Sequence, residues 1–116
     1  MLKTNVTNWE AVEAESMGEA VPGVFRRILI GPAEGAPNFI LRHFTVERGC
    51  SSPQHVHDWE HEAYILSGRG VLVNPDGEEP FGPGDAVYVA PQVKHQFRNV
   101  GDEALTFLCI IPKSGH

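Results

Sequence analysis

Residues 54–62 read Gln54-His55-Val56-His57-Asp58-Trp59-Glu60-His61-Glu62, and the rest of the chain is best interpreted outward from this stretch. Alternate residues of a β-strand share a face, so His55 and His57 can converge on one point, and His61 keeps the same even spacing. A fourth histidine, His95, stands in another strand-like segment, which a closed barrel would bring close. Neutral imidazoles bind divalent metal ions. The four histidines together predict one metal site.

The segments around this stretch have the composition of short β-strands. They are rich in Val, Ile, Phe, Tyr and Leu and are bounded by Gly, Pro, Asn and Asp. Asn74-Pro75-Asp76-Gly77 has the residues of a hairpin turn, and Gly82-Pro83-Gly84-Asp85 predicts a second sharp turn. Strands at this spacing without a long helix predict an all-β sandwich or small barrel. We expect strands at residues 25–30, 38–47, 54–57, 62–66, 70–74, 86–89, 96–100 and 104–111.

Length, charge and cysteine content limit the class of protein. The 116 residues predict a single domain, in which residues 1–23 form an N-terminal arm on or across a barrel of residues 24–116. Residues 10–19 could form one or two helical turns, which Pro22-Gly23 would end. The formal charge of −6 argues against nucleic acid or an anionic membrane as a partner. Without a membrane-spanning apolar run or a disulfide framework, a cytoplasmic protein is expected.

Two motifs of the chain resemble those of the cupin superfamily. The first begins at Gly49, contains His55-Val56-His57 and ends at Gly68, and the second extends from Gly84-Asp85 through His95. In most cupins the first motif supplies two histidines and a glutamate as metal ligands, and the second supplies a histidine. The resemblance implies a double-stranded β-helix, the jelly-roll barrel of cupins, in a single domain.

One departure from the general cupin pattern points to a subgroup. His61 occupies the place of the usual ligand glutamate, and Glu62 is one step out of phase. Small single-domain manganese cupins with a tetrahistidine site have this feature in a Trp-Glu-His-Glu signature, which stands here at residues 59–62. The chain resembles them over nearly its whole length. The resemblance implies a homodimer and a divalent metal ion, with manganese first and iron, zinc, nickel or copper as alternatives, on the ligands His55, His57, His61 and His95.

Strand alternation gives a separate reason to exclude Glu62 as a ligand. If His61 faces the interior, Ala63 and Ile65 face it too, whereas Glu62 points the other way. We therefore expect Glu62 behind the ligands or on the surface. Glu60 could accept an N–H from a ligand imidazole, as such ligands usually require. An all-histidine ligand set leaves the charge of the ion uncompensated, so the site should favour anionic or easily deprotonated oxygen donors.

Four other residues are candidates for a substrate pocket around the metal. Arg42 shares a strand face with apolar residues, which suits either a substrate carboxylate or a structural ion pair. Phe107 and Cys109 share a face of the last strand, and the resemblance directs that face toward the metal, although both could simply pack in the core. Trp59 is expected either to cover the pocket or to anchor a partner chain and orient His61.

These features favour a metal-dependent enzyme that acts on a small organic molecule. The ligand set leaves one or two coordination positions for a substrate or dioxygen, so an oxygenase-type reaction on an enolizable or phenolic compound is the first hypothesis. The missing glutamate removes the usual base, which weakens that hypothesis. The alternative is a non-enzymatic cupin that binds or senses a carboxylate or a sugar. A purely structural metal is a third hypothesis, against which the open positions argue.

Overall fold

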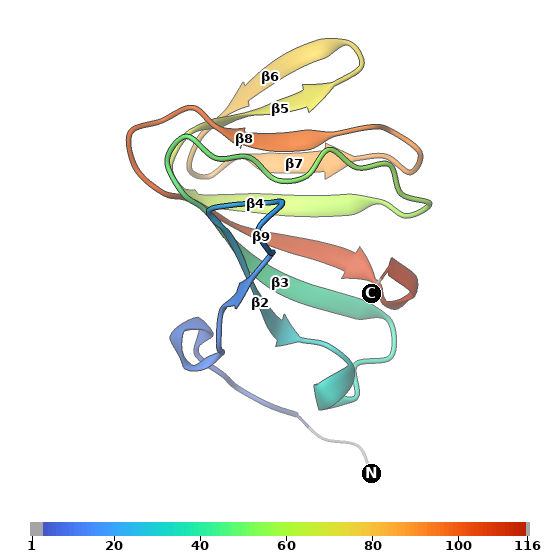
Figure 1. The fold of residues 1–116 in the computed structure, drawn as a ribbon. Helices are drawn as coiled ribbons and strands as arrows, with labels where there is room; N and C mark the ends of the chain where they lie inside the picture. The colour runs from blue at the N-terminus through green and yellow to red at the C-terminus, as the bar shows by residue number, and fades with distance from the viewer. Residues whose placement is uncertain (1–3, 116) are drawn as a thin grey trace.

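The computed structural model describes residues 4–115, in which the strands form two sheets and the helices are short turns (Figure 1). The larger sheet has the order β1-β2-β3-β9-β4-β7, and the smaller has the order β6-β5-β8. The strands are β1 (Glu15–Ser16), β2 (Val24–Ile30), β3 (Phe39–Val46), β4 (His61–Ser67), β5 (Gly70–Asn74), β6 (Gly77–Phe81), β7 (Ala86–Val89), β8 (Gln96–Asn99) and β9 (Leu105–Pro112). The three helices in this part of the chain are short 3-10 turns: η1 (Trp9–Ala11), η2 (Pro32–Glu34) and η3 (Lys113–Gly115). The all-β prediction is confirmed.

The inner faces of the two sheets share one apolar core. Alternation along the strands decides which side chains enter it, as in β4, where His61, Ala63 and Ile65 are buried and the residues between them are exposed. Strand β9 lies between β3 and β4 and supplies the centre of the larger sheet. The buried apolar residues are Val24, Ile40, Val46, Ala63, Ile65, Leu72, Phe81, Val89, Phe97, Leu105, Phe107, Cys109 and Ile111.

Local sequence was sufficient to predict two turns but not one of the strands. The Asn74–Gly77 turn joins β5 to β6 as a hairpin, and the turn at residues 82–85 leads into β7 as predicted. Strand β6 was not predicted because its sequence, Gly77-Glu78-Glu79-Pro80-Phe81, contains charges and a proline. Pro80 has no backbone N–H to donate to a neighbouring strand. This is tolerated because β6 is the edge strand of the smaller sheet.

The strand predicted at residues 54–57 is wrong. In the structure this segment is a loop that makes only an isolated antiparallel bridge, between His55 and His95. Two backbone hydrogen bonds, of 3.0 and 2.9 Å, join these two residues. Pro53 precedes the segment, and no strand pairs with it further. The face shared by His55 and His57, on which the four-ligand prediction rested, is therefore not provided by a regular strand.

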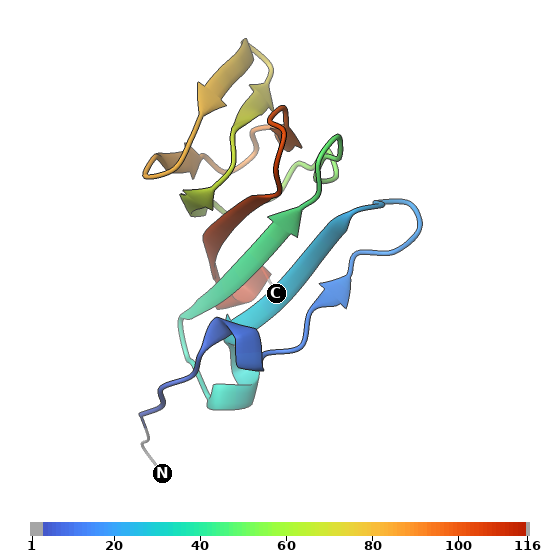
Figure 2. The same cartoon turned by 90° about the vertical axis from the view of Figure 1, so that its left-hand side faces the viewer.

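The N-terminal segment lies along the outer edge of the larger sheet (Figure 2). Helix η1 covers only Trp9–Ala11, so the helical turns expected over residues 10–19 are largely absent, and β1 pairs with β2 instead. Trp9 stacks on the buried ring of His43, with centroids 4.6 Å apart. The first three residues of the expected arm lie outside the described residues. Within residues 4–115, no helix has the length and apolar character needed to cross a membrane.

Candidate metal centre

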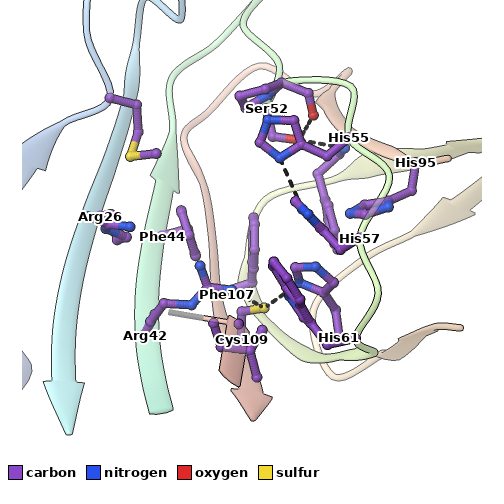
Figure 3. A pocket seen from close by; sticks show the side chains of 16 residues that line it. Arg26, Arg42, Phe44, Ser52, His55, His57, His61, His95, Phe107 and Cys109 are labelled. Atoms are coloured by element: carbon purple, nitrogen blue, oxygen red, sulfur yellow. Dashed lines mark hydrogen bonds between the residues drawn. The ribbon is translucent and has the colours of Figure 1, made fainter. Parts of the chain in front are cut away.

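Three histidine rings from separate parts of the chain meet at one end of the core (Figure 3). His61 is the first residue of β4, His95 immediately precedes β8, and His57 lies in the loop before β4. One ring nitrogen from each lies within 4.8 Å of the other two. The ring centroids are 4.8 Å apart for His61 and His95 and 5.1 Å apart for His57 and His61. This arrangement can offer three nitrogen ligands to one ion.

Two of the rings have a partner at their Nδ1 atom. The Nδ1 of His95 lies 3.0 Å from the Val93 carbonyl oxygen and donates to it, so its Nε2 carries the free lone pair. The Nδ1 of His61 lies 3.4 Å from the Cys109 sulfur. The Nε2 of His61 is buried and has no hydrogen-bond partner among residues 4–115. A buried, unsatisfied imidazole nitrogen at the centre of a histidine cluster fits a metal ligand.

His55 stands beside this cluster without joining it. Its ring is exposed, and its Nδ1 lies 3.1 Å from the Nε2 of His57. The bridge to His95 holds its backbone next to the site, but its ring nitrogens are outside the group of three that lie within 4.8 Å of one another. Of the four predicted ligands, the structure thus groups three and places the fourth in hydrogen-bond contact with one of them.

Burial keeps the central histidine neutral. Burial, reinforced by the positive charges of His95, Arg42, His57 and His55, lowers the pKa of His61 from 6.5 to about 3. The pKa values of His57 and His55 are also lowered, again mainly by burial. Neutral imidazole is the form that binds a metal, so these residues do not need to lose a proton near neutral pH.

A cavity of about 210 Å³ opens next to the histidines. All four predicted pocket residues, Arg42, Trp59, Phe107 and Cys109, line it together with His55, His57, His61 and His95. No aspartate or glutamate is among the described residues that line it. Sequence reasoning missed the remaining lining residues: Met17, Arg26, Phe44, Ser52, Pro53, Phe97, Ile111 and Gly115. The alternation of Val24, Arg26 and Ile28 was the signal that could have located Arg26.

Arg42 is held inside the cavity wall rather than in an ion pair. Its side chain is buried, and one terminal nitrogen donates to the Cys109 sulfur at 3.1 Å. Its guanidinium carbon lies 4.8 Å from the centre of the Phe44 ring. Neither ion pair in the described chain involves Arg42, so the structural ion pair considered from the sequence is not observed. Burial lowers the pKa of Arg42 and raises that of the Cys109 thiol.

Trp59 contacts a different histidine from the one expected. Its indole stacks on His57, with centroids 4.5 Å apart and an interplanar angle of 11°. The backbone of Gly115 packs against the other side of the same indole, since a Cβ there would lie 2.7 Å from it. Trp59 is half-buried and lines the cavity, so it orients His57 while it borders the pocket.

Glu60 and Glu62 both lie on the surface. In β4 the exposed Glu62 alternates with the buried His61 and Ala63 and pairs with Ile110 and Tyr88 on neighbouring strands. The hydrogen bonds of the described chain include none from either glutamate to a ligand imidazole. The positions behind the ligands are instead taken by the Cys109 sulfur and the Val93 carbonyl.

The sequence of the chain matches a known family over most of the barrel. The family model for the Cupin domain, Cupin_2, matches residues 42–111. The chain belongs to the cupin family. The jelly-roll prediction is thereby confirmed, and the three clustered histidines all lie within the matched residues.

Relatives of this cupin carry several different names. The polyketide cyclase RemF from Streptomyces resistomycificus has a solved structure with a TM-score of 0.88 and 32% identity, covering 96% of this chain and 80% of RemF. The 1-methylthio-D-xylulose 5-phosphate methylsulfurylase of Rhodospirillum rubrum is 38% identical over 61% of this chain and 46% of its own length. The glucose-6-phosphate isomerase of Pyrococcus horikoshii is 45% identical over 47% of this chain and 33% of its own length. The cupin therefore spans less than half the length of these two curated relatives.

The stability of the metal-free cupin is expected to fall as the pH falls from about 6.5. His61 binds a proton near pH 6.5 when unfolded but only near pH 3 when folded, so the unfolded state holds more protons between these values. The free energy of unfolding should drop by up to about 1.4 kcal/mol per pH unit for this one group. Urea unfolding between pH about 6.5 and 5, above the range of ordinary carboxylates, measures it. A His61→Gln variant with the same slope as the unmodified chain would contradict this assignment.

If the histidine cluster holds a divalent ion, replacing Cys109 by valine is expected to weaken the binding of added Mn²⁺ about tenfold, the low end for losing a group that orients a metal-binding histidine. Valine removes the sulfur that faces the Nδ1 of His61, so the ring loses the contact that holds its Nε2 toward the cluster. Calorimetric titration with Mn²⁺ measures the effect. Cys109→Ser, which keeps an acceptor, should restore most of the affinity, and Cys50→Ser controls for loss of a thiol elsewhere. Equal affinity in Cys109→Val and Cys109→Ser would rule out this role.

Proposed function

We propose that this cupin binds one divalent metal ion in its histidine cluster and acts as a metal-dependent enzyme on a small organic molecule. The observation that carries the proposal is that three imidazole nitrogens lie within 4.8 Å of one another at the wall of a 210 Å³ cavity. Structural metal sites are generally closed, whereas this one adjoins a cavity. The open side is where a substrate would reach the ion.

The proposed ligands are His57, His61 and His95, with His55 as the fourth after rotation of its side chain. The hydrogen bonds at Nδ1 of His61 and His95 support this set because they direct both Nε2 atoms to the same place. Manganese is the proposed native metal, in line with the resemblance to tetrahistidine manganese cupins. A bound divalent ion would supply Lewis acidity toward a substrate oxygen.

The proposed reaction is of the oxygenase type, on an enolizable or phenolic compound. The described cavity lining holds no carboxylate, so the substrate's own acidity would help it to lose a proton. Phe44, Phe107 and Trp59 make much of the wall apolar and would limit the access of water. Cyclisation of a polyketide and isomerisation of a sugar phosphate, which relatives are named for, are also reactions of carbonyl compounds.

Metal analysis followed by a turnover assay tests the proposal. The metal content of the purified chain and its electron paramagnetic resonance spectrum come first, with and without 2,4-pentanedione as a chelating enol. Oxygen uptake and mass spectrometry of products then follow for 2,4-pentanedione and for catechol. Oxygen uptake with an oxidised product supports the oxygenase-type reaction, and conversion without oxygen uptake supports an isomerase or lyase instead. A chain that holds no metal and takes up none would overturn the whole proposal.

A second candidate is a cupin that binds a small molecule without converting it. The absence of a carboxylate among the described residues of the cavity favours it, since no ordinary base stands next to the substrate space. Under this alternative, the metal-loaded chain would bind 2,4-pentanedione with a spectral change but yield no product over many hours.

We also propose a homodimer and a cytoplasmic location. The outer face of β4, β7 and β9 exposes several large apolar side chains, which a second copy could cover: Tyr64, Leu66, Tyr88 and Ile110. Both cysteines are free, which suits a reducing compartment. Light scattering coupled to size-exclusion chromatography tests the dimer, and a Tyr64→Lys change should then shift the mass toward that of one chain.

A further inference from the structure

Arg42 carries a buried charge for which the described chain provides no counter-charge. Its side chain is 9% exposed, and its only hydrogen bond among residues 4–115 goes to the neutral sulfur of Cys109. Its Nε is buried and has no partner there. A buried guanidinium is costly unless it is paired and fully hydrogen-bonded. Because Arg42 lines the cavity, a bound molecule could supply the missing partner.

A second arginine faces the same cavity. Arg26, on β2, stands opposite Phe44 in the sheet, whereas Arg42 lies two residues before Phe44 on β3. One terminal nitrogen of Arg26 makes a 3.4 Å ion pair with Glu15. Its Nε is buried without a hydrogen-bond partner in the described chain. Two cations on one wall of a small cavity repel each other, and an anion between them would relieve that repulsion.

The arginines lie across the pocket from three of the histidines, whereas His61 shares the Cys109 sulfur with Arg42. Figure 3 shows Arg26 and Arg42 on one side of the pocket and His55, His57 and His95 on the other. Between them lies a row of stacked rings, with centroids 5.4 Å apart for Phe44 and Phe107 and 4.7 Å apart for Phe107 and Phe97. The guanidinium of Arg42 lies over the first of these rings, and its packing there fixes its orientation. The cavity thus has a cationic end, an apolar floor and a histidine end.

The charge of the cavity is opposite to that of the whole chain. The chain carries a formal charge of −6, yet the described lining holds two arginines and no acidic residue. Low-dielectric walls strengthen the field of these arginines inside the cavity. A planar guanidinium fork binds a carboxylate or a phosphate through paired hydrogen bonds.

We propose that Arg42, assisted by Arg26, binds the carboxylate or phosphate group of an organic substrate. The body of that substrate lies on the Phe44 and Phe107 rings, and its opposite end reaches the histidine cluster. This inference rests on the proposed function, since it names the substrate class of the same site. It requires an anionic group and a flat or apolar body in one molecule.

Three probes that share a phenyl ring test the proposal: benzoate, phenyl phosphate and the neutral benzamide. Calorimetric titrations use the full-length chain as purified and after removal of metal by a chelator, so that a contact with the metal does not hide the contact with the arginines. We expect at least one anion to bind both forms, and benzamide to bind much more weakly. Arg42→Gln should weaken that anion about 30-fold or more, as for loss of one partner of a buried charge pair. The tighter of the two anions identifies the substrate group.

Three further variants separate binding from folding. Arg26→Gln should weaken the same anion to a smaller extent, and Arg42→Lys should not restore full affinity because it lacks the fork. Arg98→Gln is the matched control, since Arg98 pairs with Glu78 outside the cavity. Melting curves show whether each variant folds. The proposal is overturned if neither anion binds, if benzamide binds as well as benzoate, or if folded Arg26→Gln and Arg42→Lys both bind like the unmodified chain. Anion binding by a chain that takes up no metal would leave this inference standing and remove only the proposed enzyme.

Discussion

Replacing His61 by glutamine is expected to lower the affinity of the cupin for Mn²⁺ by more than about a hundredfold. This loss exceeds the usual effect of removing a residue that only orients a metal ligand, because His61 is itself a proposed ligand. Among the three histidines of the cluster, His61 is the one whose buried Nε2 lacks a hydrogen-bond partner in the described residues. The three ring centroids form a triangle, 5.1 Å from His57 to His61, 4.8 Å from His61 to His95 and 5.6 Å from His57 to His95, so the loss of His61 would leave two of the three nitrogens. The measurement is metal content per chain together with calorimetric titration with Mn²⁺.

Two histidine variants make this experiment specific. His43→Gln removes another buried histidine, which stacks on Trp9 and does not line the cavity, and it should leave Mn²⁺ affinity unchanged. His55→Gln distinguishes three ligands from four, because a fourth ligand should cost at least about tenfold in affinity. Full Mn²⁺ binding by a folded His61→Gln chain would show that the metal lies elsewhere.

Replacing Gly68 by alanine is expected to lower the free energy of unfolding by about 3 kcal/mol or more, among the larger effects of single substitutions. Gly68 has a φ of +82°, which side chains rarely adopt. A Cβ there would lie 2.5 Å from the carbonyl oxygen of Ala104 and 2.8 Å from the Cα of Leu105, so the start of β9 would have to move. Urea denaturation of the metal-free chain measures the loss.

Gly35→Ala is the matched control for this substitution. Gly35 has nearly the same φ, +79°, but no atom within 4 Å of the position of its Cβ. It should therefore show only the cost of the left-handed backbone, about 1–2 kcal/mol. Equal losses in the two variants would mean that the backbone of β9 yields easily. A larger loss for Gly68→Ala locates the constraint in the contact between the β4–β5 turn and β9.

The grouping of the histidines was predictable because histidine is rarely concentrated without a reason, but the arrangement of their rings was not. His57, His61 and His95 meet as expected, although the segment that holds His57 is a loop rather than a strand. The even spacing of His57 and His61 allowed their rings to converge whether the segment was a strand or a loop. For His55 the even spacing did not determine the direction of the ring, because outside a β-sheet the direction of a side chain depends on its local contacts. Here that contact is a hydrogen bond to His57.

The pocket was only partly predictable for a related reason. Alternation put Phe107 and Cys109 on one face of their strand and Arg42 on a face with apolar residues. The resemblance to manganese cupins then directed the face of Phe107 and Cys109 toward the metal. Arg26 was missed although it alternates with Val24 and Ile28 along its strand. Met17 comes from a segment whose neighbours are known only once the strands pair, since it follows β1, which is too short to be recognised in the sequence. The edge strand β6 was missed because proline and charged residues have low strand propensity. An edge strand nevertheless tolerates them.

Local and short-range rules were therefore enough to predict the all-β fold and the residue types of a candidate metal site, and the two motifs were enough for the resemblance to cupins. Periodicity and turn chemistry act over a few residues, so they can be read along the chain. The position of His55, the contact of Cys109 with His61 and the two unpaired cavity nitrogens of Arg26 and Arg42 depend on strands distant in sequence. Only the tertiary structure decided them, because burial and the absence of a nearby partner are properties of the packed molecule.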